Sequence, residues 1–130
     1  MSIVPRPIVE PLCRLDELPE RRSRGFDPLG EGRDTLFLIR LEDRVFAWRN
    51  ACPHYEFARM AWKKDEFLNA DHSLILCGAH GALFDIVDGH CVKGPCEGQR
   101  LTAVPLELRD GAIYIVGDYA PGLRKHQPRS

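Results

Sequence analysis

Two short motifs in this chain place a cysteine close to a histidine. The first is Cys52-Pro53-His54, and the second is Cys77-Gly78-Ala79-His80-Gly81. Two cysteines and two histidines can hold one tetrahedral zinc ion, or they can hold two irons bridged by sulfides, with the thiolates on one iron and the imidazoles on the other. Zinc ribbons usually use Cys-x-x-Cys pairs or a helical pair of histidines. The asymmetric spacing therefore favours the two-iron arrangement, and the zinc site stays open as an alternative.

The sequence resembles the Rieske [2Fe–2S] family, and especially its small soluble ferredoxins, from residue 34 to residue 117. Besides the two motifs, the resemblance rests on Phe84-Asp85 with the turn Asp88-Gly89, on Gly94-Pro95, and on the segment 111–115 that closes the domain. The resemblance implies an all-β, Rieske-like fold of antiparallel sheets. A small cluster-binding subdomain, formed by the two ligand loops, is then expected at one tip.

The same resemblance assigns the ligands of one [2Fe–2S] cluster. Cys52 and Cys77 would bind the buried iron, and His54 and His80 would bind the exposed iron. Gly94-Pro95 would form a third loop packed over the cluster. The sequence departs from the family pattern at two positions, because Glu56 stands where a glycine is usual and Gly78 stands where a proline is frequent.

Residues around the cluster indicate which branch of the family the chain is similar to. High-potential Rieske proteins typically have a disulfide between the ligand loops and two hydroxyl groups aimed at cluster sulfurs. The matching positions here are Phe57 and Ala79 for the bridge, Ala82 for the serine and Phe84 for the tyrosine. The resemblance thus implies a low-potential ferredoxin, a dioxygenase component that passes electrons from an NAD(P)H-dependent reductase to a terminal oxygenase.

Composition bounds the class of protein. The chain has 130 residues, of which 44% are hydrophobic and 28% charged, and its formal net charge is -1. We expect one domain over residues 1–130, with a core at about 34–117, a loop-rich N-terminal segment at 1–33 and a flexible tail at 118–130. The balanced charge argues against nucleic acid and membrane partners. The lack of a signal peptide or spanning helix favours a reducing cytoplasm, with Cys13, Cys91 and Cys96 as thiols outside a disulfide framework.

Short apolar runs bounded by turn residues predict the strands that position the motifs. Residues 35–39 and 45–48 read as a hairpin, and residues 73–76 run directly into Cys77. Asp88-Gly89 and Asp110-Gly111 are typical tight-turn dipeptides. Further strands are expected at 84–87, 90–93, 101–109 and 112–116, and residues 12–18 could form an edge strand or one helical turn.

Several side chains have a structural interpretation beside a functional one. The basic run Arg21–Arg24 predicts a solvated loop, and residues 55–72 predict a loop whose apolar side chains cover the end of the barrel. The functional alternative for both is docking of a redox partner. His72, His90 and His126 are expected to be surface residues, and Trp48 and Trp62 to be packing residues.

Three functions remain in competition. The leading hypothesis is a one-electron carrier without substrate chemistry, so an electron-transfer component and not an enzyme. The first alternative is enzymatic: the small Rieske-like subunit of a nitrite reductase, or the N-terminal domain of an oxygenase, although the second iron site of an oxygenase would need histidines beyond His90 and His126. The second alternative is a zinc-stapled interaction module with no redox role.

Overall fold

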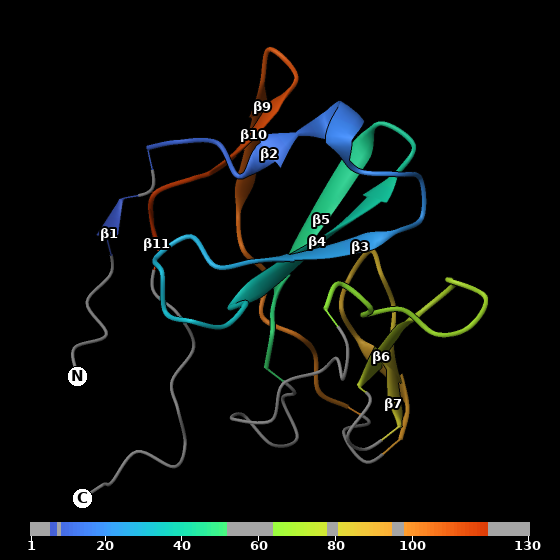
Figure 1. Cartoon of the computed structure of the whole chain (residues 1–130). Helices are drawn as coiled ribbons and strands as arrows, with labels where there is room; N and C mark the ends of the chain where they lie inside the picture. The colour runs from blue at the N-terminus through green and yellow to red at the C-terminus, as the bar shows by residue number, and fades with distance from the viewer. Residues whose placement is uncertain (1–5, 8, 52–63, 78–80, 95–97, 120–130) are drawn as a thin grey trace, which may run out of the picture.

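The computed structural model describes residues 6–7, 9–51, 64–77, 81–94 and 98–119, and the strands among them pair in antiparallel fashion (Figure 1). This arrangement confirms the all-β fold class. In chain order the elements of the described part are β1 Arg6–Pro7, β2 Cys13–Arg14, the 3-10 turn η1 Leu15–Glu17, β3 Ser23–Phe26, β4 Leu36–Leu41, β5 Arg44–Arg49, β6 Ile75–Cys77, β7 Ala82–Phe84, β8 Cys91–Lys93, β9 Leu106–Arg109, β10 Ala112–Ile115 and β11 Asp118–Tyr119.

The strands form small sheets that stack along the molecule. Their orders are β1-β11, β2-β10-β9, β3-β4-β5 and β6-β7-β8. In Figure 1, β2, β9 and β10 lie at the top, β3, β4 and β5 cross the middle, and β6 and β7 lie at the bottom. The β3-β4-β5 sheet therefore separates the two ends, and the strand that ends at Cys77 belongs to the bottom one.

Strand β4 is buried on both faces. Leu36, Phe37, Leu38 and Ile39 are each 0% exposed. Because successive side chains of a strand point to opposite faces, Phe37 and Ile39 enter one apolar cluster, whereas Leu36 and Leu38 enter the other. This double burial explains why the strand is a continuous apolar run instead of an alternating one. The predicted hairpin is confirmed, since β4 pairs with β5 over its whole length.

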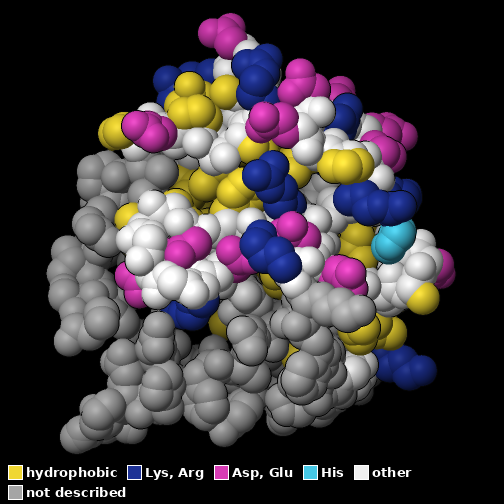
Figure 2. All heavy atoms as spheres, in the orientation of Figure 1, with side chains coloured by type: hydrophobic (Ala, Val, Ile, Leu, Met, Phe, Trp, Pro, Cys, Tyr) yellow, Lys and Arg dark blue, Asp and Glu magenta, His cyan; other side chains and the backbone are white. Residues whose placement is uncertain are grey.

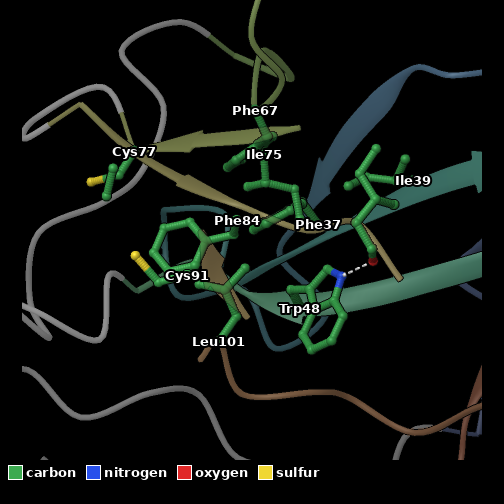
Figure 3. Close-up of a cluster of buried hydrophobic side chains, with 11 residues drawn as sticks. Phe37, Ile39, Trp48, Phe67, Ile75, Cys77, Phe84, Cys91 and Leu101 are labelled. Carbon is green, nitrogen blue, oxygen red and sulfur yellow. Dashed lines mark hydrogen bonds between the residues drawn. The ribbon is translucent and has the colours of Figure 1, made fainter. Parts of the chain in front are cut away.

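We call the two groups of buried side chains the site-side cluster and the distal cluster. The site-side cluster fills the space between β4-β5 and the β6-β7-β8 sheet, and its members are Phe37, Ile39, Trp48, Phe67, Ile75, Cys77, Ala82, Phe84, Ile86, Cys91 and Leu101 (Figure 3). The distal cluster joins the other face of β4-β5 to the β2-β10-β9 sheet through Cys13, Leu18, Leu36, Leu38, Ala47, Val104, Ile113 and Ile115.

The basic run differs from the sequence-based expectation. Ser23 and Arg24 do not lie in a solvated loop, because they begin β3, which pairs with β4 from Ser23 opposite Ile39 to Phe26 opposite Leu36. The side chain of Arg24 remains exposed while its backbone is part of the sheet. A polar strand of this kind is held by cross-strand pairing and not by an apolar pattern of its own.

Two predicted strands have other bounds than expected: β7 lies at Ala82–Phe84 and not at 84–87, and β9 is shorter than 101–109. Strand β7 ends at Phe84, and Asp85 begins a turn in which Gly89 N donates to Asp85 O at 2.9 Å. Likewise β9 begins only at Leu106. The preceding residues follow β5 irregularly, with Val104 N donating to Ala47 O at 3.0 Å.

Other expectations hold. Asp110 and Gly111 have φ values of +53° and +80° and connect β9 to β10 as a tight hairpin turn. The segment 12–18 contains both a short strand and a helical turn, β2 and η1. The expected flexible tail differs at its start, because Asp118–Tyr119 forms β11 and pairs with β1, and residues 120–130 lie outside the described part.

Candidate metal centre

Cys77 is the predicted ligand that the structure describes. It is the last residue of β6, is 0% exposed, and lies directly opposite Ala82 of β7. Figure 3 shows Cys77 at the edge of the site-side cluster, with its sulfur turned away from the rings of Phe37 and Trp48. The strand thus delivers a thiol to the margin of the apolar core, as predicted from the run 73–76.

The connection after Cys77 turns tightly. Gly81 N donates to Cys77 O at 2.7 Å, and Gly81 has φ +72°, a conformation that side chains rarely adopt. The tight turn predicted at Gly81 is thereby confirmed, whereas the Gly81 N–H donates to the backbone oxygen of Cys77 and not to a sulfur. His80 belongs to residues 78–80 of this connection, which lie outside the described residues, as do Cys52 and His54. The assignment of the four ligands, Cys77 included, stays a prediction.

Ala82, which lies opposite Cys77, and Phe84 belong to the same apolar cluster as Cys77. Both side chains are 0% exposed and carry no hydroxyl. Phe57 and Ala79, which stand where high-potential Rieske proteins have a disulfide, lie outside the described residues. The chemistry of a buried cysteine fits a thiolate-bound iron, because a thiolate is a soft donor and the apolar cluster around Cys77 limits the access of water.

The third predicted loop begins at a close backbone approach. Gly94 follows β8 with φ +112°, and a Cβ built on it would lie 2.8 Å from the Cα of Ala82. A glycine is required at this position because the chain runs directly against the residue opposite Cys77. Pro95, which would complete that loop, lies outside the described residues.

The remaining cysteines are buried or outside the described part. Cys13 is a free thiol of the distal cluster, and burial raises its pKa to about 11, with Arg24 opposing the effect. A thiol with so high a pKa is a poor nucleophile. The Cys91 sulfur donates to Lys93 O at 3.5 Å, and Cys96 is not described.

The predicted packing and surface residues hold where they can be seen. Trp48 is 5% exposed and its indole nitrogen donates to Ile86 O at 3.1 Å. The side chain of His90 is exposed and that of His72 is half-buried beside Arg22, whereas His126 and Trp62 lie outside the described part. Phe67 stacks on Phe37 with ring centroids 4.1 Å apart, so the described end of the 55–72 segment does cover the core.

Sequence reasoning missed a group of polar contacts beside the first motif. Lys64 Nζ contacts the carboxylates of Asp34 and Asp65 at 3.2 and 2.6 Å. Only Gly25, which directly follows the basic run, could have signalled these contacts, because a glycine inside a strand often marks a close approach.

The family model described as a Rieske [2Fe–2S] domain matches residues 9–115. The chain belongs to the Rieske [2Fe–2S] family. It therefore binds one [2Fe–2S] cluster. The family match begins well before residue 34 and includes β2 and β3.

Solved structures place this Rieske domain beside ferredoxins. The ferredoxin of carbazole 1,9a-dioxygenase from Nocardioides aromaticivorans IC177 is 25% identical, with a TM-score of 0.63, and the match covers 89% of this chain and 98% of that one. A complex of reduced oxygenase and oxidized ferredoxin in carbazole 1,9a-dioxygenase contains a chain that is 21% identical, with a TM-score of 0.62 and coverage of 82% and 99%. No curated protein matches the chain.

A third neighbour has a different description. The small subunit of a putative NADPH nitrite reductase is 18% identical, with a TM-score of 0.57, and the match covers 83% of this chain and 97% of that one. At this identity the likeness shows the fold alone. Together with the family match, the ferredoxin neighbours identify this Rieske domain as a ferredoxin-like electron carrier.

Two further observations concern the described residues. No helix there is long and apolar enough to cross a membrane. Figure 2 shows basic and acidic side chains interspersed over the face in view, and not gathered by sign.

Proposed function

We propose that this Rieske domain passes single electrons from an NAD(P)H-dependent reductase to a terminal oxygenase. The observation that carries the proposal is the match to nearly the whole length of the carbazole 1,9a-dioxygenase ferredoxin. The complex of a similar ferredoxin with its oxygenase supports the choice of acceptor. When bound, a [2Fe–2S] cluster accepts and releases one electron at a time.

The ligands in this proposal are Cys52 and Cys77 for one iron, and His54 and His80 for the other. Cys77 supports it, since a buried thiol at a strand end fits the inner iron. Ala82 and Phe84 exclude water behind that thiol without donating a hydrogen bond to it.

A low reduction potential follows from the same residues. Hydrogen bonds to cluster sulfurs stabilise the reduced, more negative state and raise the potential. Because positions 82 and 84 carry no hydroxyl, we expect a midpoint near the lower end of the Rieske range, at about −150 to −50 mV near neutral pH. Such a potential suits reduction by an NAD(P)H-linked reductase, and the buried free thiol of Cys13 suits a reducing cytoplasm.

Substitution of Cys77 tests the ligand assignment. We expect Cys77→Ser to lose the [2Fe–2S] cluster, because a hydroxyl is a much harder ligand than a thiolate. Iron, acid-labile sulfide and the visible spectrum of protein purified without air provide the measurement. The substitution Cys91→Ser, at another buried cysteine of the site-side cluster, should retain both irons. A full-strength spectrum in Cys77→Ser would show that the ligand is elsewhere.

The proposed partners require a separate experiment. The reduced protein is mixed in a stopped-flow instrument with a purified oxygenase of the carbazole type, and its reoxidation is followed. Reduction is followed with NADH and the matching reductase. Rapid electron transfer in both steps supports the proposal, and failure with every oxygenase tried would contradict it.

The nitrite reductase neighbour supports a second candidate function. In that case the chain would act as the small subunit of an NADPH-dependent enzyme that reduces nitrite. Stable association with a nitrite reductase large subunit, without electron transfer to an oxygenase, would favour it.

A further inference from the structure

Asp34 contacts both ends of the segment that carries the first motif. Its backbone oxygen accepts a hydrogen bond from Asn50 Nδ2 at 2.9 Å, and its carboxylate lies 3.2 Å from Lys64 Nζ. Asn50 directly precedes residues 51–63, and Lys64 directly follows them. One residue between β3 and β4 therefore joins the entry and the exit of this segment.

The exit is held by more than one contact. Lys64 Nζ also donates to Asp65 Oδ1 at 2.6 Å and to Gly25 O at 3.2 Å. Asp65 Oδ1 accepts from Gly25 N at 2.7 Å, while Ser23 Oγ donates to Asp65 O at 2.6 Å and accepts from Phe67 N at 3.0 Å. Backbone and side-chain bonds thus fasten residues 64–67 to β3.

The strand is shaped to admit the Asp34 carboxylate. A Cβ built on Gly25 would lie 2.3 Å from Asp34 Oδ2. Only a glycine at this position lets the carboxylate approach the strand and reach Lys64. The Asp34 side chain is 18% exposed, whereas Lys64 is 62% exposed, so the acidic partner is the fixed member of the pair.

We propose that Asp34 is a positioning residue for the cluster. By contacting both Asn50 and Lys64, it fixes where these two residues lie, and they flank the part of the sequence that carries the proposed ligands Cys52 and His54. The inference rests on the ligands proposed above. It concerns how firmly the metal is held and not which partner receives the electron.

The proposed effect of Asp34 is to lower the conformational entropy that is lost when the metal binds. Each backbone residue that is ordered loses conformational entropy, so a loop whose ends are already fixed loses less when it binds a metal. An exposed ion pair alone contributes little. Here, however, the same ammonium group is shared by two carboxylates and a carbonyl, and such networks of charge-assisted bonds are stronger than isolated pairs.

The substitution Asp34→Asn isolates the effect, because it removes the charge but keeps the backbone oxygen that binds Asn50. The control is Asp43→Asn, which makes the same change at an exposed residue in the turn between β4 and β5. Metal release to an excess chelator is measured on the loaded proteins. We expect release about three- to tenfold faster in Asp34→Asn, and wild-type release in the control.

Two further measurements distinguish positioning from a general loss of stability. The EPR spectrum of the dithionite-reduced protein reports ligand geometry, and it should change in Asp34→Asn but not in Asp43→Asn. The double variant Asp34→Asn/Lys64→Met should release metal no faster than Lys64→Met alone, because both changes break the same contact. An unchanged EPR spectrum, additive effects, or release within twofold of wild type would each overturn the proposal.

The experiments distinguish failure of the proposed function from failure of the positioning role of Asp34. If the reduced wild-type protein passes electrons to none of the proposed partners while Asp34→Asn still releases metal faster than the control, the proposal of these partners fails and the positioning role stands. If the wild-type protein carries two irons and Asp34→Asn behaves like the control, the carrier proposal stands and the positioning role falls.

Discussion

At the scale of single residues, Ala82 has the largest influence on what the site can do. It lies opposite Cys77, is completely buried, and is approached by the backbone of Gly94. A residue so placed can change the surroundings of the thiolate sulfur without being a ligand. Its methyl group provides no hydrogen bond, so the thiolate has one donor fewer than a serine would supply.

Substitution of Ala82 by serine should raise the reduction potential. A charge-assisted hydrogen bond contributes about 1.5–3 kcal/mol, so we expect an increase of some tens of millivolts after competition with existing donors. Voltammetry of the loaded protein measures it. The control is Ala112→Ser, which adds the same hydroxyl to a buried alanine of β10, at the other end of the molecule (Figure 1). A wild-type midpoint above about +100 mV would refute the low-potential assignment.

A second prediction at the scale of single residues concerns the stability of a variant at Gly89. A Cβ there would lie 2.6 Å from the Trp48 ring, and the residue has φ +73°. Gly89→Ala should therefore lower the free energy of unfolding by about 2–4 kcal/mol, because it strains the backbone and displaces the Trp48 ring. Gly117→Ala has a similar φ, +77°, with nothing within 4 Å, and should cost only about 1–2 kcal/mol. Equal losses in urea unfolding would show that the ring contact does not matter.

At the scale of elements, the connection between β3 and residues 64–67 is sensitive to acid. Burial opposes the charge on Asp65, but hydrogen bonds from Lys64 and Gly25 hold its pKa below the usual value. The carboxylate therefore stabilises the fold above the ordinary pKa of about 4, and this contribution is lost as the pH falls through the lower folded value.

The expected result is a fall in thermal midpoint below about pH 4 that is smaller in Asp65→Asn than in the wild type. The variant should already be less stable at neutral pH, because the ionised partner of Lys64 is gone. Midpoints from pH 7 to pH 3, with Asp43→Asn as the control, provide the test. Parallel curves for Asp65→Asn and the wild type would exclude Asp65 as the titrating group.

Elements with local signals could be predicted from the sequence, and elements held by distant partners could not. The β4-β5 hairpin and the Asp110-Gly111 turn carry their own apolar pattern and turn residues. Strand β3 has neither, since its pairing with β4 decides its conformation. Ile86 extended an apolar run beyond β7, but it is buried in a turn where its carbonyl binds Trp48.

The candidate site divides in the same way. The arrival of Cys77 at a strand end follows from the run that precedes it. The ion pair between Asp34 and Lys64 joins residues that are distant in the sequence. Short sequence motifs do not predict such contacts. The four ligands are predicted from the two motifs and the family resemblance, and three of them lie outside the described residues.

At the scale of the whole molecule, the segment before residue 34 is part of the fold. Leu18 is 1% exposed in the distal cluster, and β3 covers one edge of β4. Removing residues 1–26 should therefore prevent cooperative folding, because β4 would become an exposed apolar edge.

A point substitution measures the same contribution in a chain that still folds. Leu18→Ala should lower the free energy of unfolding by about 2–5 kcal/mol. The control Val9→Ala changes a side chain that is 79% exposed and should lower it by less than about 0.5 kcal/mol. Denaturant unfolding of the loaded protein gives both values. A truncated chain with native spectra and a sharp transition would show that the core begins later.

The pairing of β2 with β10 bears on the order of events during synthesis. Cys13 lies opposite Ile113, so the distal cluster cannot close until the strand made last in that sheet has left the ribosome. Pairings between such distant segments form slowly, and apolar edges stay open in the meantime. The nascent chain therefore contains Cys77 before the distal cluster can close, and we expect the metal to enter the domain only after β10 has been synthesised.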